Sequence, residues 1–155
     1  TRSSDLEIPA CSPAAATAPK PSFTVSPSLP FNANNHMDQY FEGLKNIAIT
    51  VCDEDGNILD MNQHSADVNS HGQKIVGYNL MNCHPEPAKT KLKGLLEHQE
   101  LNAYTIEKTL ADGSKVKKLI YQTPWYKEDG NFGGLIEYSI EIPFDMPHFV
   151  RQPKK

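Results

Sequence analysis

The chain has 155 residues, enough for one domain with a single core. Its net charge of −4, without long runs of Lys or Arg, argues against nucleic acid or an anionic membrane as the main partner. It has no apolar run long enough to span a membrane and no signal-peptide pattern at its start. Its three cysteines, Cys11, Cys52 and Cys83, are too few for a disulfide-stapled secreted domain, which favours a reducing cytoplasm.

Residues 1–36 differ in composition from the rest of the chain. They contain half of the 12 prolines, many Ser and Ala, and few charged residues. This composition predicts a disordered or extended leader. His36 and Met37 are typical of a cloning junction followed by a natural start, so the leader is either vector-derived or a native linker. We assign it no chemistry and place the folded domain at 37–155.

The apolar pattern predicts the first elements from Met37 onward. A short amphipathic helix is expected, because apolar residues recur at helical spacing. Its stripe consists of Met37, Tyr40, Phe41 and Leu44. Alternating residues then predict a hairpin, with strands at 46–52 and 57–61 around an Asp-Glu-Asp-Gly turn. Short helices and loops are expected over 62–78.

One longer helix and three more strands are predicted after this. The helix spans 85–99, where leucines fall on one face. The strands follow at 103–110, 115–126 and 132–142, joined by two Gly-containing turns. In the last strand apolar residues alternate with polar ones, so each kind occupies one face. This order of strands and helices predicts an α+β fold, with the helices on one face of a five-stranded antiparallel sheet.

This order of elements resembles a PAS domain, the sensor module of many bacterial signalling proteins. The resemblance covers about 37–142 and is carried by DEDGNILDMNQ (53–63), GYNLMNCHPEPAKTKL (77–92) and IYQTPWYKEDGNFGGLIEYSIEI (120–142). The CHPEP segment is similar to a Cys-His-Pro-Pro form found in small stand-alone PAS proteins. The resemblance implies a non-catalytic sensor module with a small-molecule pocket between the sheet and the long helix. It does not specify the molecule, because PAS domains carry haem, flavins, organic acids or nothing.

We expect the pocket to be lined by apolar residues of the strands and the long helix. The candidates are Ile49, Val51, Leu80, Leu92, Leu96, Tyr104, Tyr121, Ile136 and Tyr138. The stripe of the first helix is expected to form a homodimer interface. The preferred function is binding of an unknown small molecule or partner. Its alternatives are a structural dimerisation module with a filled core and a haem-binding gas or redox sensor.

The adjacent Cys83 and His84 raise the question of a reactive or haem-binding pair. Neighbouring residues point their side chains in different directions, which makes a catalytic dyad between them unfavourable. Pro85, Glu86 and Pro87 are typical of a first helical turn, so a structural role at the helix start is preferred over redox or haem sensing. The sequence requires no cofactor, and we assign no catalytic residue and no metal ligand.

Overall fold

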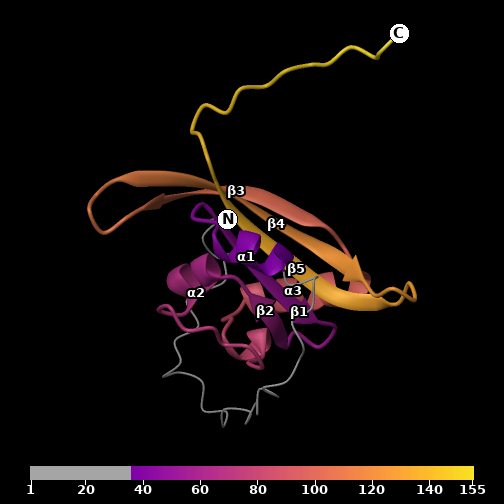
Figure 1. The fold of residues 1–155 in the computed structure, drawn as a ribbon. Helices are drawn as coiled ribbons and strands as arrows, with labels where there is room; N and C mark the ends of the chain where they lie inside the picture. The colour runs from indigo at the N-terminus through magenta and orange to yellow at the C-terminus, as the bar shows by residue number, and fades with distance from the viewer. Residues whose placement is uncertain (1–35) are drawn as a thin grey trace.

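The computed structural model describes residues 36–155, with side chains from Asp38 onward. Its strands form one antiparallel sheet in the order β2-β1-β5-β4-β3. The strands are β1 Ile47–Asp53, β2 Ile58–Met61, β3 Asn102–Thr109, β4 Lys115–Tyr126 and β5 Phe132–Ile142. The helices are α1 His36–Glu42, α2 Gln63–Asn69 and α3 Ala88–His98, with a short 3-10 turn, η3, at Leu80–Asn82 (Figure 1). The predicted fold class is confirmed.

The first helix forms where its apolar spacing predicts it. It ends at Glu42, so Leu44 lies just beyond it. The leader predicted for 1–36 lies outside the described residues except for His36, with which α1 begins. The boundary between leader and domain therefore remains a prediction.

The side chain of Asn62 joins three elements at one edge of the sheet. Its Oδ1 caps α2 by accepting from the Ser65 amide at 3.0 Å, and accepts from the Ile49 amide at 2.9 Å. Its Nδ2 donates to the carbonyls of Phe41 and Ile47, each at 2.9 Å. Because all these bonds converge on one buried amide, Asn62 fixes the end of α1 and the start of α2 against β1.

The helix start at α3 differs from the prediction. Pro85 and Pro87 are not in the first helical turn: α3 begins at Ala88, and Pro87 occupies the N-cap position without a side-chain cap bond. The physical reason is that a residue before proline is driven out of the helical region, which excludes Glu86 from the helix. The Glu86 carboxylate still accepts from the amide and hydroxyl of Thr90, as expected for an anion at a helix N-terminus.

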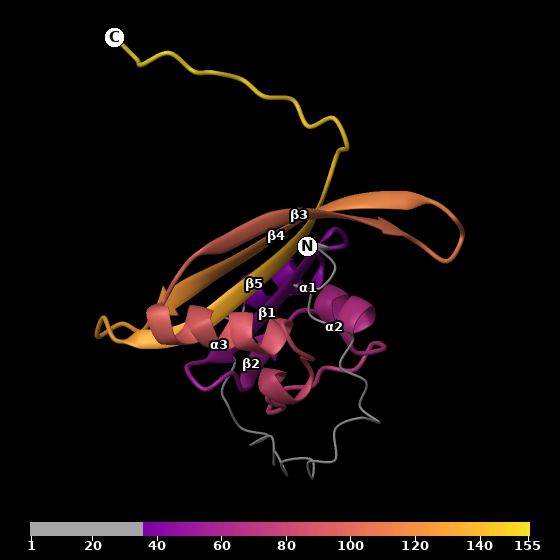
Figure 2. The ribbon, with the colours of Figure 1, turned by 180° about the vertical axis from the view of Figure 1, so that it is seen from behind.

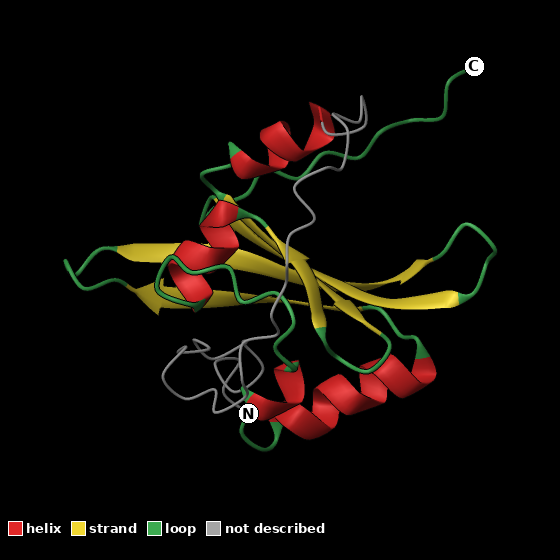
Figure 3. Cartoon of the chain, turned by 60° about the horizontal axis from the view of Figure 1, so that its bottom comes forward, coloured by secondary structure: helices red, strands yellow, loops and turns green. Residues whose placement is uncertain are grey.

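The two faces of the sheet have different covers. Figure 3 shows α3 on one side of the sheet and α1 on the other. We call the side under α3 the inner face and the side under α1 the outer face. Viewed from behind, α3 lies along the sheet, and α2 lies beyond one end of α3 (Figure 2). The main core is on the inner face, where Leu92, Leu95 and Leu96 of α3 pack with Cys52 and Leu135 of the central strands.

A glycine pair allows the central strands to approach each other closely. A Cβ at Gly133 would lie 2.4 Å from the Trp125 ring, and one at Gly134 would lie 2.0 Å from the Cys52 carbonyl oxygen. The Trp125 indole Nε1 donates to that same carbonyl at 2.9 Å. The backbone φ of Gly134 is +148°, a value that residues other than glycine rarely adopt. Trp125 is thus a packing residue that holds β4, β5 and β1 together.

Candidate functional site

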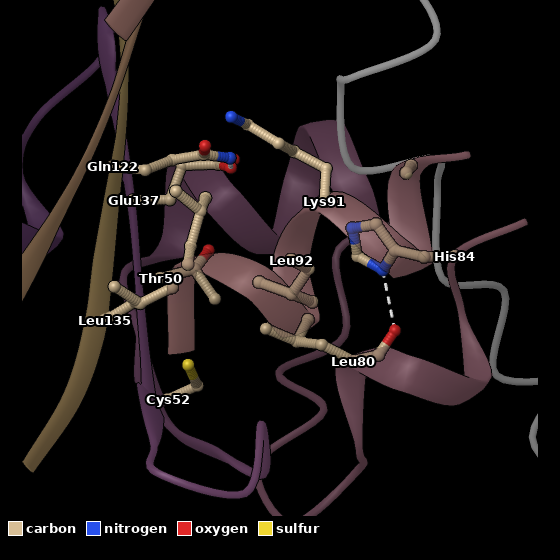
Figure 4. A pocket seen from close by; sticks show the side chains of 11 residues that line it. Thr50, Cys52, Leu80, His84, Lys91, Leu92, Gln122, Leu135 and Glu137 are labelled. Carbon is tan, nitrogen blue, oxygen red and sulfur yellow. Dashed lines mark hydrogen bonds between the residues drawn. The ribbon is translucent and has the colours of Figure 1, made fainter. Parts of the chain in front are cut away.

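A small cavity lies between α3 and the inner face of the sheet (Figure 4). Its free volume is about 20 Å³, roughly the space of one water molecule. Leucines, Ala88 and Cys52 form its apolar part, while its polar part comes from β1, β5, β4, α3 and the loop before α3. The polar side chains that line it are Thr50, His84, Lys91, Gln122 and Glu137.

The strand side of the cavity is a chain of hydrogen-bonded polar side chains. Asn102 Nδ2 donates to Gln122 Oε1 at 2.8 Å, and Gln122 Nε2 donates to Glu137 Oε2 at 2.7 Å. Thr50 lies directly opposite Glu137 across β1 and β5, and shares a 2.6 Å bond with the Ser65 hydroxyl. Gln122, Glu137 and Thr50 are all buried. Their bonds offset the cost of placing polar groups under a helix, and they fix the direction of each donor and acceptor.

His84 supplies an acceptor from the opposite wall. It is only 7% exposed, and its Nδ1 lies 2.6 Å from the Leu80 carbonyl oxygen. Burial lowers the pKa of His84, although the Leu80 carbonyl opposes this by favouring the protonated ring. The ring is therefore neutral at pH 7, with its proton on Nδ1, where it donates to that carbonyl. Nε2 then carries a lone pair, and it points into the space between His84 and Lys91 (Figure 4).

Lys91 brings a positive charge to the mouth of the cavity. It is exposed on α3, and its side chain extends across the opening toward Gln122 and Glu137 (Figure 4). A flexible ammonium group lies at the mouth, and behind it the buried carboxyl group of Glu137 accepts a hydrogen bond from Gln122. Such a site favours a small polar molecule over a purely apolar one.

The two described cysteines offer no reactive thiol. Burial raises the pKa of Cys52 to about 11, so its sulfur is a protonated, apolar part of the cavity floor. Cys83 is disulfide-bonded. It is therefore not a free thiol beside His84. Within residues 36–155, no three His, Cys, Asp or Glu side chains lie close enough together to hold a metal ion.

The structure divides the predicted pocket residues between the two faces. Leu80 and Leu92 line the inner cavity. Leu96 belongs to the adjacent core, and Tyr104 is half-buried on β3 beside Ile120. Leu80, Leu92 and Leu96 belong to η3 and α3, which line the cavity, whereas no residue of β3, the strand of Tyr104, lines it.

The remaining predicted residues lie on the outer face. Ile49, Val51, Ile136 and Tyr138 line a separate groove beside α1. Tyr121 pairs with Tyr138 across β4 and β5 and therefore shares that face. The predicted set is thus not one pocket, because strand residues of the same parity as Ile49 and Ile136 point away from α3.

The polar wall of Thr50, Gln122 and Glu137 was missed by sequence reasoning. Ile49, Val51, Ile136 and Tyr138 were expected on the pocket side, whereas the structure places Thr50, Gln122 and Glu137 there, beside the apolar Cys52 and Leu135. One signal existed for Thr50, which lies in the middle of an almost wholly apolar strand, where a solvated position is not expected; Glu137 alternates with Ser139 and Glu141 and gave no such signal.

The predicted interface stripe is exposed where the structure describes it. Tyr40 is 63% exposed and Phe41 41%, while Leu44 is half-buried and the Met37 side chain lies outside the described residues. No helix in the described part of the chain has the length and apolar character needed to cross a membrane.

Comparisons with known proteins identify the fold. No protein-family model and no curated protein matches the sequence. The PAS domain of BvgS from Bordetella pertussis matches the structure with a TM-score of 0.52 and 18% identity, over 72% of this chain and 88% of that one. A PAS domain from Colwellia psychrerythraea matches with a TM-score of 0.50 and 20% identity, over 72% and 98%. VqmA bound to DPO matches with a TM-score of 0.51 and 16% identity, over 69% and 57%.

Proposed function

We propose that this domain, which has the PAS fold, is a sensor module that binds a small polar ligand between α3 and the inner face of the sheet, without catalysis of its own. The observation that carries the proposal is the buried polar wall. Thr50, Gln122 and Glu137 occupy positions that leucine or valine would fill in a merely structural core, and they converge on a cavity with His84. The structural neighbour VqmA is a protein bound to DPO, which supports ligand binding as a use of this fold.

The residues define the chemistry of the ligand. His84 Nε2 accepts a hydrogen bond, so the ligand needs a donor on that side. Lys91 donates, so an oxygen or ring nitrogen is expected near the mouth. A cavity of about 20 Å³ holds one water as it stands, so even a small ligand displaces α3 to some extent. A haem- or flavin-sized group requires a much larger displacement, which makes the haem alternative less favourable.

Native mass spectrometry of freshly purified full-length protein is the first test. A retained small molecule supports the proposal. Thermal-shift titrations with amino acids, hydroxy acids and small nitrogen heterocycles then define the ligand class. We expect Ala88→Leu, which fills the cavity, to abolish every shift, and Glu137→Gln to change the selectivity.

Gly94→Ala is the matched control on the same helix, because a Cβ there would meet nothing within 4 Å. Binding that survives Ala88→Leu as well as Gly94→Ala places the ligand elsewhere and contradicts the proposal. A Soret band in the visible spectrum would show bound haem and would favour the haem-binding sensor over the small polar ligand. A chain with neither retained ligand nor thermal shift favours the structural module with a filled core.

The outer face favours a second role, self-association through α1. The exposed aromatic residues Tyr40 and Phe41 project from a helix too short to be stable without packing. We expect a homodimer in sedimentation velocity, and a folded monomer when both residues are replaced by Glu, because burial of unpaired charges is strongly unfavourable. A wild type that stays monomeric at high micromolar concentration contradicts this role. A bacterial origin and the absence of a nucleic-acid partner belong to the same proposal. The cytoplasmic location expected from the few cysteines is at odds with the disulfide at Cys83, because disulfides are rare in a reducing cytoplasm.

A further inference from the structure

The last residues of the chain form an arm that does not pack on the domain. The arm, residues 143–155, contains no helix or strand, and after a turn at Phe144–Asp145 it extends away from the body (Figures 1 and 2). Within residues 36–155, its one side-chain hydrogen bond to the domain is a 3.4 Å bond from Lys117 Nζ to the Phe144 carbonyl. Phe149 is 71% exposed and Val150 78%. A segment with this much exposed apolar surface favours a partner surface.

A matching surface exists on the outer face. The groove between α1 and the strands encloses about 450 Å³, far more than the inner cavity. Its floor is apolar and is made by Phe41 of α1 together with Ile49, Val51, Ile136 and Tyr138 of the central strands.

The rim of the groove is acidic. Asp38, Glu42 and Asp60 lie along it, together with Lys74. Lys74 forms a 2.6 Å ion pair with Glu42. Asp38 and Asp60 have no basic partner among the side chains that the structure describes. The groove therefore presents an apolar floor with unneutralised negative charge at its edge.

The arm carries the complementary charge. Arg151, Lys154 and Lys155 follow its apolar residues directly, against a single acid, Asp145. The Arg151 guanidinium lies 5.7 Å from the centroid of the Phe149 ring, so the positive charge and the aromatic group are presented together. Apolar side chains that fit an apolar floor, with basic residues next to an acidic rim, are the pattern of a steered interface.

The direction of the chain favours a second copy over the arm's own groove. Ile136 and Tyr138, in the groove floor, precede the end of β5, and the arm continues beyond that end. To reach its own groove the arm would have to reverse direction, yet it contains no glycine. Pro143, Pro147 and Pro153 favour an extended backbone instead.

We propose that the arm of one copy docks into the outer groove of a second copy, with Phe149 and Val150 on the apolar floor and the basic residues against Asp38 and Asp60. This contact is independent of the ligand cavity on the inner face. Phe41 of α1 belongs to both this groove and the α1 contact, so variants of the arm, such as Val150→Ser, are the ones that distinguish the two contacts.

Photo-crosslinking of the full chain tests the proposal. Phe149 is replaced by p-benzoylphenylalanine, and this protein is mixed with wild-type chain labelled with heavy nitrogen. We expect crosslinks from Phe149 of one copy to Ile136, Tyr138 or Phe41 of the other, identified by mass spectrometry of mixed-isotope peptides. The same group at Leu110, an exposed residue next to the β3–β4 turn, is the control and should give no groove crosslink.

The outcomes separate the possible occupants of the groove. Crosslinks within one copy show the arm in its own groove, and crosslinks from other residues to the floor show another segment there; both overturn the proposal, as does the absence of groove crosslinks. Replacing Val150 by Ser in the crosslinking protein should lower the yield about tenfold, because it removes apolar area from the docked segment. High salt should lower it further. If the chain is a dimer but gives no groove crosslinks, the arm-docking proposal is wrong and the α1 dimer is unaffected.

Discussion

The two faces of this sheet use opposite halves of the same strands. The inner face, under α3, carries buried polar residues such as Thr50, Gln122 and Glu137. The outer face, only partly covered by α1, carries apolar residues such as Ile49 and Ile136. In an ordinary half-covered sheet the apolar face is the buried one. Here the inner face does hold the main core, through buried residues such as Cys52 and Leu135, but a buried polar patch is set into it, and the partly covered outer face is apolar as well.

The largest loss of stability is expected at the close contact between β5 and β1 at Gly134, on which both faces of the sheet depend. Gly134→Ala places a Cβ against the β1 backbone, at 2.0 Å from the Cys52 carbonyl oxygen. Because that neighbour is backbone, β1 and β5 must separate, and we expect a loss of about 4 kcal/mol in unfolding free energy by urea titration.

Gly113→Ala is the control for this prediction. Its φ is +86°, but a Cβ there would meet nothing within 4 Å. It should therefore lose only about 1 kcal/mol from backbone strain. Equal losses at the two glycines would mean that close strand approach does not hold the two faces together.

The next effect compares one apolar residue from each face. Leu95→Ala, in the core under α3, should cost about 3 kcal/mol, because the side chain is almost fully buried and a cavity remains. Ile140→Ala, half-buried on the outer face, should cost about 1 kcal/mol in the monomer. The measurement is urea unfolding at low protein concentration. If Ile140→Ala costs as much as Leu95→Ala, the outer face is already fully covered in the isolated chain.

A smaller effect is expected from the pH dependence of the inner face. The pKa of His84 in the fold lies below its ordinary value of 6.5, because burial disfavours the charged ring. The unfolded chain therefore binds more protons at low pH, and stability rises with pH. The contribution of neutral His84 is complete above pH 6.5 and is lost as the pH falls below it toward the folded pKa.

Urea unfolding at pH 7.5 and pH 5.5 measures this effect. His84→Asn keeps a donor for the Leu80 carbonyl but does not titrate, so the fall between the two pH values should be smaller than in the wild type. His98→Asn, at the exposed end of α3, should behave like the wild type. An unchanged fall in His84→Asn would exclude His84 as its cause.

The last prediction concerns the reactivity of the Cys52 thiol in the folded chain rather than the free energy of unfolding. With a pKa of about 11, Cys52 should not react with Ellman's reagent at pH 8 until the chain unfolds. A cysteine introduced at Thr105, exposed on β3, should react at once. Rapid reaction of Cys52 in the folded chain would show that the inner face opens readily to solvent.

The strands were predictable because their signals are local. The bounds of β4 and β5 agree with those expected from alternation and Gly-containing turns. The start of α3 was placed too early, although the restriction that Pro87 imposes on Glu86 was present in the sequence. The candidate site was only half predictable, since Leu80 and Leu92 were expected there and Thr50, Gln122 and Glu137 were not.

The sequence by itself determined which residues share a face, because side chains alternate along a strand whatever surrounds it. It also determined the PAS-like order of elements through turn residues and helical spacing. Only the tertiary structure decided which face α3 covers. That choice depends on the register of five strands and on contacts such as the hydrogen bond from Trp125 Nε1 to the Cys52 carbonyl, which joins residues far apart in the chain. The polar cavity and the apolar groove both follow from it.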